Sequence, residues 1–468
     1  MYRSASLLAL CLAAAGTLAA CDTADDDLAA VTAAERLPGG SGTNTLLLGS
    51  NAFTPPLDGL DTDETLAFYS GNSFFSQAWV QAPASTDARD GLGPMFNARS
   101  CSACHAFDGR GRPPLEDDEE IIGLLFRLSV PGAAEDEAPY PDPVYGGQLQ
   151  PFGLGGVPAE ATPRILREEI HGAYDDGTPY TLERPTYVFE DPAYGDLPDD
   201  LEVSPRVAPQ VIGMGLLEAI PEADILALAD PDDADGDGIS GRAQYVTDPR
   251  TGELALGRFG WKGDAPTVEA QSAGAFHGDM GLTTSLHPEP ECTDSQTVCS
   301  EVASGGDPEV SDLILGRVTS YLQFLAVPVR TRWDDTEIRR GKHAFNQIGC
   351  ASCHVAEHTT REDAISPALS SQRIFPYTDL LLHDMGPDLA DDRPLFRASG
   401  QEWKTPPLWG IGRFPTVNDH DRLLHDGRAR GVAEAILWHG GEAEASRDAF
   451  KALDAARRAA LIAFVESL

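Results

Sequence analysis

Two copies of one short motif carry most of the chemistry that this sequence can perform. Residues 101–105 read Cys-Ser-Ala-Cys-His, and residues 350–354 read Cys-Ala-Ser-Cys-His. This spacing is the attachment signature of c-type haem, because the two thiols reach two vinyl groups on one porphyrin edge and the adjacent histidine reaches the iron. Zinc is a poorer explanation, since neither motif has a second Cys/His pair nearby. A thioredoxin-like pair would need a βαβ context, which is absent. The sequence therefore predicts two covalent haems, held by Cys101, Cys104, His105, Cys350, Cys353 and His354.

The other cysteines have simpler roles. The chain contains eight cysteines, of which Cys11 and Cys21 belong to an N-terminal segment with the form of a targeting signal. Cys292 and Cys299 lie seven residues apart, and an exported chain most simply joins such a pair in a local disulfide. No free thiol is then left for nucleophilic catalysis.

The first 21 residues have the form of a secretory signal. Arg3 precedes a short apolar stretch that is too short to span a membrane. Leu18-Ala19-Ala20-Cys21 resembles a bacterial lipobox, which implies cleavage before Cys21 and lipidation of that cysteine. The alternative is ordinary cleavage after Ala20. We expect a protein on the periplasmic side of a bacterial cell envelope, attached to the membrane through its lipid anchor only.

The net charge of the chain limits the kinds of macromolecule that it can bind. The formal net charge is −40, which argues against a nucleic-acid-binding surface. Three explanations of the acidity stay open: solubility, a salty habitat, or steering of a basic partner. The chain also contains 46 glycines and 35 prolines, which predicts a loop-rich protein.

An internal repeat organises the chain. Phe96-Asn97 precedes the first motif and Phe345-Asn346 precedes the second, at the same spacing. We therefore expect a mainly α, loop-rich fold with two cytochrome c-like haem modules, the first carrying large insertions. The predicted division is a lipoprotein signal at 1–21, a flexible leash at 22–60, an N-terminal catalytic-haem domain at 61–330 with an insertion at about 115–255, and a C-terminal electron-transfer domain at 331–468. Helices are predicted at 311–327, at 335–347 and from 446 onward.

Several longer segments resemble a known family. GLGPMFNARSCSACH, LLEAIPE, DADGDGISGR, GRFGWKG, LLHDMG and LLHDGRAR are similar to segments of bacterial dihaem cytochrome c peroxidases and of the dihaem enzyme that matures methylamine dehydrogenase. They are closer still to a dihaem oxidoreductase/peroxidase branch sometimes labelled thiol oxidoreductase. The resemblance implies reduction of hydrogen peroxide, with electrons from a small cytochrome c or copper protein entering at the C-terminal haem. Two alternatives are a dihaem electron carrier without substrate and a dihaem oxidase acting on a protein or a sulfur compound.

The resemblance also implies a sixth ligand for the C-terminal iron. In the peroxidases this ligand lies fourteen residues after the histidine of a His-Asp-Gly turn. His425 begins that turn here, so the corresponding residue is His439. Met385 is the rival ligand. A histidine in place of the usual methionine should lower the potential of the haem.

The same resemblance implies a catalytic trio in the N-terminal module. Trp261 and Gln271 keep the family spacing of an indole and an amide, and Asp279 stands near the position of the family's acid, which is usually glutamate. Peroxide cleavage needs an acid/base to move a proton between two oxygens, an amide to hydrogen-bond the reacting oxygen and an indole to relay an electron. His277 and Met280 are rivals that could occupy the iron instead.

One acidic loop predicts a possible calcium site. Asp233, Asp235 and Asp237 alternate in a D-x-D-x-D-G pattern, with glycine at the sharp turn that a calcium loop requires. Gln244 stands where a full EF-hand would have its bidentate glutamate. The alternative is a solvated acidic turn.

Overall fold

The fold mixes helices with short strands. The structure, a computed structural model, describes residues 28–86, 88–116 and 119–468, so the predicted signal segment and Cys21 lie outside the described residues. The helices are α1 (Thr62–Ser76), α2 (Cys101–Cys104), α3 (Met214–Glu218), α4 (Glu222–Leu226), α5 (Val268–Met280), α6 (Asp312–Gln323), α7 (Thr336–Gln347), α8 (Phe414–Val417), α9 (Val432–Trp438), α10 (Glu444–Ala452) and α11 (Ala455–Glu466). The prediction of a mainly α fold is corrected to a mixed one, while the loop-rich character is as expected.

The strands pair two by two. Every sheet in the described part of the chain has two antiparallel strands, in the pairs β1–β3, β2–β6, β4–β5, β7–β8, β9–β10, β11–β12 and β13–β14. Their bounds are β1 (Met95–Phe96), β2 (Leu124–Ser129), β3 (Phe152–Gly153), β4 (Thr162–Ala173), β5 (Pro179–Glu190), β6 (Glu202–Val207), β7 (Tyr245–Thr247), β8 (Leu254–Leu256), β9 (His358–Thr359), β10 (Arg373–Ile374), β11 (Leu382–Asp384), β12 (Glu402–Lys404), β13 (Arg422–Leu423) and β14 (Ala429–Arg430). The longest strands fall in residues 115–255, which the sequence analysis treated as an insertion.

Helix ends follow local capping chemistry. The Ser311 side chain accepts a hydrogen bond from the Ile314 amide and begins α6, which ends at Gln323 rather than running on toward Pro328. The single helix expected from residue 446 is two helices, because the chain leaves helical geometry at Leu453 and Asp454 caps the start of α11. Of the predicted helices, the one at 335–347 agrees best with the structure, as α7.

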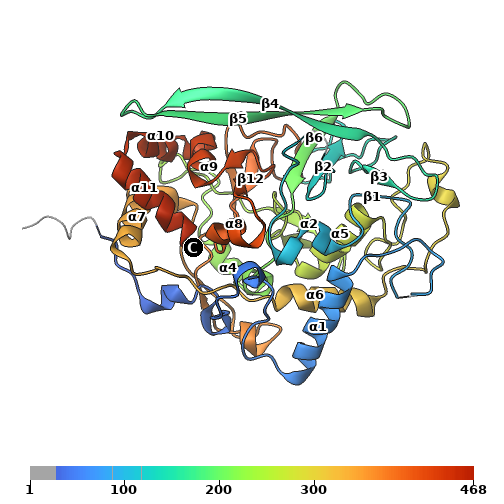
Figure 1. Cartoon of the computed structure of the whole chain (residues 1–468), viewed down its shortest axis with the longest axis horizontal. Coiled ribbons are helices and arrows are strands. Elements are labelled where there is room, and N and C mark those ends of the chain that lie inside the picture. Colours follow the sequence, from blue (N-terminus) through green and yellow to red (C-terminus); the bar gives the residue numbers. More distant parts are fainter. Residues whose placement is uncertain (1–27, 87, 117–118) are drawn as a thin grey trace, which may run out of the picture.

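A long hairpin of β4 and β5 contacts both halves of the molecule. Figure 1 shows it running along one side, past both the C-terminal helices and the β2–β6 pair. Near its open end Phe189 packs edge-on against Phe126 of β2, with ring centroids 5.2 Å apart. Beside its turn Asp176 forms a 2.6 Å ion pair with Arg458 of α11. The hairpin therefore contacts both the N-terminal and the C-terminal parts of the chain.

The main hydrophobic core also spans both halves. One continuous cluster of buried side chains includes Phe276 and Tyr321 from the N-terminal half and Phe345, Trp438 and Phe464 from the C-terminal half. The two haem motifs are thus built around a common core. None of the described helices is both long enough and apolar enough to cross a bilayer.

Candidate functional site

Both Cys-x-x-Cys-His motifs open into one internal cavity. The cavity measures about 390 Å³, and its lining includes all four motif cysteines and both motif histidines, which the structure brings together although they lie far apart in sequence. The four thiols are not joined in disulfides. Burial raises the pKa of Cys101, Cys104 and Cys350 to about 12.

The first motif presents its histidine to the cavity with one ring nitrogen already bonded. The Nδ1–H of His105 donates to the backbone carbonyl of Pro209 over 2.7 Å. This bond fixes the tautomer and leaves Nε2 free to bind a metal, which is the usual arrangement of a metal-ligating histidine. Burial lowers the pKa of His105, so the neutral ligand form is favoured.

The second motif pairs His354 with His439. His354 donates from Nδ1 to the Tyr377 carbonyl over 3.1 Å, and His439 donates from Nδ1 to the Ala435 carbonyl over 2.6 Å. Burial, together with the nearby His439, lowers the pKa of His354 to about 4. Both rings line the cavity with Nε2 free. The rival Met385 lines the same cavity.

Helix α5 carries two members of the predicted trio. Gln271 and Asp279 lie on this helix, and both side chains line the cavity. The helix ends at Gly281 (φ 63°), which packs so closely on Gly93 that a Cβ on Gly93 would lie 2.5 Å from the Gly281 Cα. This contact holds Asp279 beside the segment that leads into the first motif, where its backbone carbonyl accepts the Asn97 amide over 2.8 Å.

The surroundings of the Asp279 carboxyl shift its pKa upward. Burial raises its pKa, while the positive charge of Arg127 and a 2.9 Å hydrogen bond from Gln148 Nε2 act in the opposite direction. A carboxyl whose pKa is moved toward neutrality exchanges protons more readily at neutral pH.

Trp261 lies where the two halves meet. Its indole Nε1–H donates to the carbonyl of Val207 over 2.8 Å, and its own carbonyl accepts the Lys404 amide over 2.9 Å. The Val207 amide donates to the carbonyl of His425, the first residue of the His-Asp-Gly turn. Trp261 lines the cavity that contains both motifs, so all three members of the trio border one space.

The two rivals at the first motif differ in position. His277 is not part of the cavity lining; its Nε2 is bonded to the Glu289 carbonyl over 2.9 Å and its ring stacks on His287. The structure thus places His277 away from the site. Met280, by contrast, is buried and does line the cavity.

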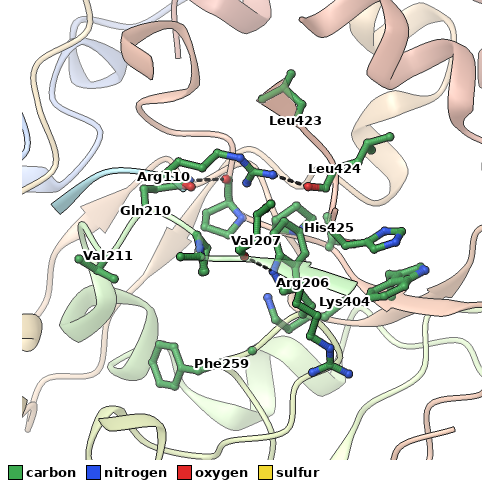
Figure 2. A pocket seen from close by; sticks show the side chains of 18 of the residues that line it. Arg110, Arg206, Val207, Gln210, Val211, Phe259, Lys404, Leu423, Leu424 and His425 are labelled. Atoms are coloured by element: carbon green, nitrogen blue, oxygen red, sulfur yellow. Dashed lines mark hydrogen bonds between the residues drawn. The ribbon is translucent and has the colours of Figure 1, made fainter. Parts of the chain in front are cut away.

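Sequence reasoning missed the basic groups of the cavity. Figure 2 shows Arg206, Lys404 and His425 around it, with Arg110 hydrogen-bonded to the Leu424 carbonyl. Arg206 Nη2 and His425 Nε2 are buried without a hydrogen-bond partner among the described residues. Burial lowers the pKa of Lys404 to about 8. Unpaired buried donors are costly, and the carboxylate substituents of haem would pair with them. The residues present therefore fit two haems.

A second missed cluster lies beside the second motif. His383 bonds to Asp379 over 2.8 Å and to Glu442 over 2.7 Å, and its Nδ1 lies 3.6 Å from Cys353 Sγ. Burial opposes the charged ring, but the hydrogen bonds to these carboxylates raise the pKa of His383 to about 12. The LLHDMG segment contains His383, and its partner Asp379 lies only four residues earlier, but Glu442 comes from a distant segment of the sequence.

The acidic loop brings two of the three predicted aspartates together with Asp230. Carboxylate oxygens of Asp230, Asp233 and Asp235 lie within 4.8 Å of one another, and Asp237 is outside this group. Asp237 instead accepts the Ile239 amide over 2.9 Å. Asp230 thus lies with two of the three predicted residues, and the predicted role of Asp237 is left as a prediction. Whether calcium binds there stays a prediction.

The fold and the cavity define a class of protein with two haem-binding motifs facing a common interior. Residues 34–162 and 168–468 match the family described as "Di-haem oxidoreductase, putative peroxidase". The chain belongs to this family, as its sequence motifs predict. A solved structure of hydrazine synthase from Kuenenia stuttgartiensis, pressurized with 20 bar xenon, is 12% identical with a TM-score of 0.30, over 91% of this chain and 98% of that chain. No curated protein matches the chain.

Proposed function

We propose that this di-haem oxidoreductase is a peroxidase with two covalent c-type haems. One observation carries the proposal: Asp279, Gln271 and Trp261 line the same cavity as both Cys-x-x-Cys-His motifs. The cysteines would form thioether bonds, His105 would bind one iron, and His354 with His439 would bind the other. The bound haems supply redox chemistry and a coordination position for hydrogen peroxide.

The side chains around this position have distinct roles. Asp279 takes a proton from the inner peroxide oxygen and returns it to the outer one, which makes water the leaving group. The Gln271 amide donates a hydrogen bond to the reacting oxygen. Trp261, between the halves, provides the aromatic contact through which electrons from the C-terminal half pass. A small cytochrome c or copper protein would be the electron donor.

Substitution of Asp279 tests this role. Asp279→Asn keeps the size and hydrogen bonding of the side chain but cannot accept the proton. We expect peroxide turnover to fall by about 10²- to 10⁴-fold, the usual contribution of one positioned acid/base. Haem content and reducibility should stay at wild-type levels. Trp261→Phe is the matched comparison, because it should slow electron passage between the haems and leave peroxide binding unchanged. Wild-type turnover in Asp279→Asn would contradict the assignment.

The cellular setting belongs to the same proposal. A lipid on Cys21 would tether the protein to the envelope membrane, with the catalytic body on the periplasmic side. This location suits both cytochrome c maturation and the Cys292–Cys299 disulfide that the structure contains.

A further inference from the structure

A buried cluster of three side chains, Asp379, His383 and Glu442, lies against the second Cys-x-x-Cys-His motif. His383 is only 3% exposed, and each of its ring nitrogens faces a carboxylate. Nε2 lies 2.8 Å from Asp379 Oδ2, and Nδ1 lies 2.7 Å from Glu442 Oε2. A ring that bonds a carboxylate at both nitrogens donates from both, which only the protonated imidazolium can do. The cluster therefore contains one positive and two negative charges.

The imidazolium also reaches a sulfur atom of the second motif. His383 Nδ1 lies 3.6 Å from Cys353 Sγ, within the range of a weak hydrogen bond to sulfur. A thioether sulfur is still a weak acceptor, so this contact is compatible with attachment of haem at Cys353. His383 and Glu442 both line the haem cavity. The charged ring is thus part of the cavity wall at the point where the haem would be attached.

Backbone hydrogen bonds fix Asp379 to the same motif. The Asp379 amide donates to the Cys353 carbonyl over 3.1 Å, and the Leu381 amide donates to Asp379 Oδ1 over 2.9 Å. Two residues before Asp379, the Tyr377 carbonyl accepts the hydrogen bond from His354 Nδ1. The segment that orients the iron-binding histidine therefore also positions one carboxylate of the cluster.

A different segment holds Glu442 and covers the ring. Ser240 donates to Glu442 twice, from its amide over 3.2 Å and from its hydroxyl over 2.6 Å. The next residue, Gly241 (φ 58°), packs directly on the ring, because a Cβ there would lie 3.3 Å from His383 Cε1. The cluster is therefore fixed in position and shielded from solvent.

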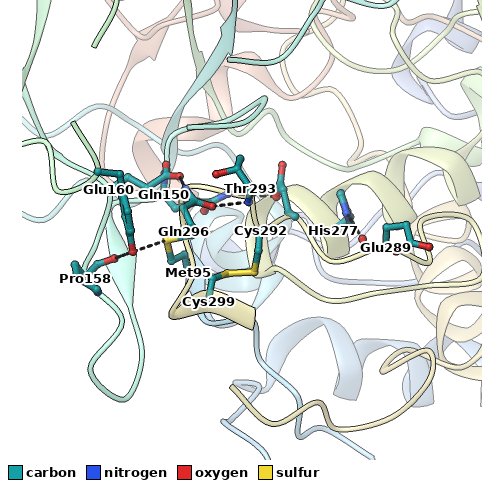
Figure 3. The surroundings of a disulfide bond; sticks show 12 residues. Met95, Gln150, Pro158, Glu160, His277, Glu289, Cys292, Thr293, Gln296 and Cys299 are labelled. Carbon is teal, nitrogen blue, oxygen red and sulfur yellow. Dashed lines mark hydrogen bonds between the residues drawn. A yellow bond between two sulfur atoms is a disulfide. The ribbon is translucent and has the colours of Figure 1, made fainter. Parts of the chain in front are cut away.

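Another buried carboxyl of the protein shows the effect of neutral partners. Figure 3 shows Glu160 together with Gln150 and Gln296 beside a disulfide bond. Glu160 accepts hydrogen bonds from the Gln150 amide and the Gln296 side chain, and burial raises the pKa of Glu160 to about 8. Burial acts in the same direction on Glu442, but the hydrogen bond from His383 lowers the pKa of Glu442 below its usual value. The charged ring thus keeps Glu442 ionised.

We propose that the Asp379–His383–Glu442 cluster sets the reduction potential of the C-terminal haem, with His383 as a positioning residue that holds a positive charge and a hydrogen bond at the Cys353 sulfur. The proposal rests on the proposed function, because it requires haem at the second motif. Hydrogen bonds and charges around a haem are among the means by which a protein adjusts its potential.

The direction of each effect follows from the sign of the charge. A positive charge stabilises ferrous haem, which carries one more electron than ferric haem, and a negative charge stabilises the ferric state. Buried charges are screened only weakly. His383 therefore raises the potential, whereas Asp379 and Glu442 lower it. Since a second histidine ligand lowers the potential, the charge of His383 offsets part of the effect of His439.

Two opposite changes of charge test the cluster at about pH 6, where histidine side chains are mostly protonated. His383→Gln removes the positive charge, so the potential of the C-terminal haem should fall. Asp379→Asn removes a negative charge at constant size, so the potential should rise. We expect each variant to change the reduction equilibrium constant of this haem roughly tenfold, or about 59 mV for one electron.

His358→Gln is the matched control. His358 is also buried, and its Nε2 bonds the carbonyl of Thr378, next to Asp379, over 2.7 Å. This variant disturbs the same segment without a change of charge in the cluster, so the potential should stay at the wild-type value. Glu442→Gln supplies a second loss of negative charge if Asp379→Asn does not fold, and it should also raise the potential.

Redox titration followed by absorption spectroscopy measures these potentials, and the signal that is lost when Cys350 and Cys353 are both changed to alanine identifies the C-terminal haem. A wild-type potential in His383→Gln, or shifts of the same sign in His383→Gln and Asp379→Asn, would overturn the inference. If the opposite shifts appear but the wild type consumes no peroxide, the proposed peroxidase function fails and the role of the cluster stands. If the wild type consumes peroxide but the shifts are absent, only the role of the cluster fails.

Discussion

The histidines show how much of the site depends on single hydrogen bonds. His105, His354 and His439 each donate from Nδ1 to a backbone carbonyl and keep Nε2 free in the cavity. His277 uses Nε2 for a carbonyl instead and lies outside the lining. Sequence spacing alone made His277 a candidate ligand, and one hydrogen bond distinguishes it from the others.

Replacement of His439 tests its role as the second ligand of the C-terminal iron. His439→Met should raise the potential of that haem, because a thioether stabilises ferrous iron relative to imidazole. The shift should fall within the roughly 0.8 V range that axial ligands control. Redox titration followed by absorption spectroscopy measures it. Met385→Leu is the control. If the potential of the haem changes in Met385→Leu and not in His439→Met, Met385 is the ligand.

At the scale of elements, the β4–β5 hairpin stabilises the His-Asp-Gly turn. The Tyr187 hydroxyl on β5 donates to Asp426 Oδ2 over 2.9 Å, and Arg428 Nε donates to the same oxygen over 2.8 Å. Burial would raise the pKa of Asp426, but the Arg428 charge lowers it to about 2, so the carboxyl is ionised. The hairpin thereby holds the turn that precedes His439.

Removal of the Tyr187 hydroxyl should destabilise this contact. A hydrogen bond to a charged group contributes about 1.5–3 kcal/mol, so Tyr187→Phe should lower the free energy of unfolding by about that amount. Tyr180→Phe, on the same strand, should have a smaller effect because its ring packs on Tyr174 without help from the hydroxyl. Urea denaturation compares the two, and equal losses would show that the hydrogen bond contributes nothing specific.

The acidic loop is also tested as an element. If Asp230, Asp233 and Asp235 bind calcium, chelator should lower the thermal stability of the wild type, by about 2.7 kcal/mol when free calcium had been a hundredfold above Kd. Asp233→Asn with Asp235→Asn should remove the chelator effect. Asp237→Asn should preserve it, because Asp237 lies outside the group. If chelator changes the thermal stability of the wild type, the double variant and Asp237→Asn equally, the loop is an acidic turn that does not bind calcium.

Some of these elements could be predicted and others could not. The helix predicted at 335–347 agrees closely with α7, whereas the helix predicted at 311–327 starts correctly at the Ser311 cap but ends earlier, at Gln323. The hairpin was missed although Asp176-Gly177 is a strong turn signal, because its strands alternate weakly between polar and apolar residues. The position of Trp261 could not be predicted, since Val207 and Lys404, which fix it, come from distant segments.

At the scale of the whole molecule, one interior serves both motifs. The core and the hairpin cross between the halves, so the motifs are held at a fixed relative position. The net charge of −40 would attract a basic electron donor over long range.

The half-reduced protein offers the most direct test of the central claim. One electron per molecule should reduce the C-terminal haem and leave the N-terminal haem able to bind peroxide. We predict a high-spin signal from one haem and stoichiometric peroxide consumption after half-reduction. Two low-spin haems with no peroxide consumption would contradict the peroxidase account, and Met280 would then be the expected ligand of the first iron in an electron carrier.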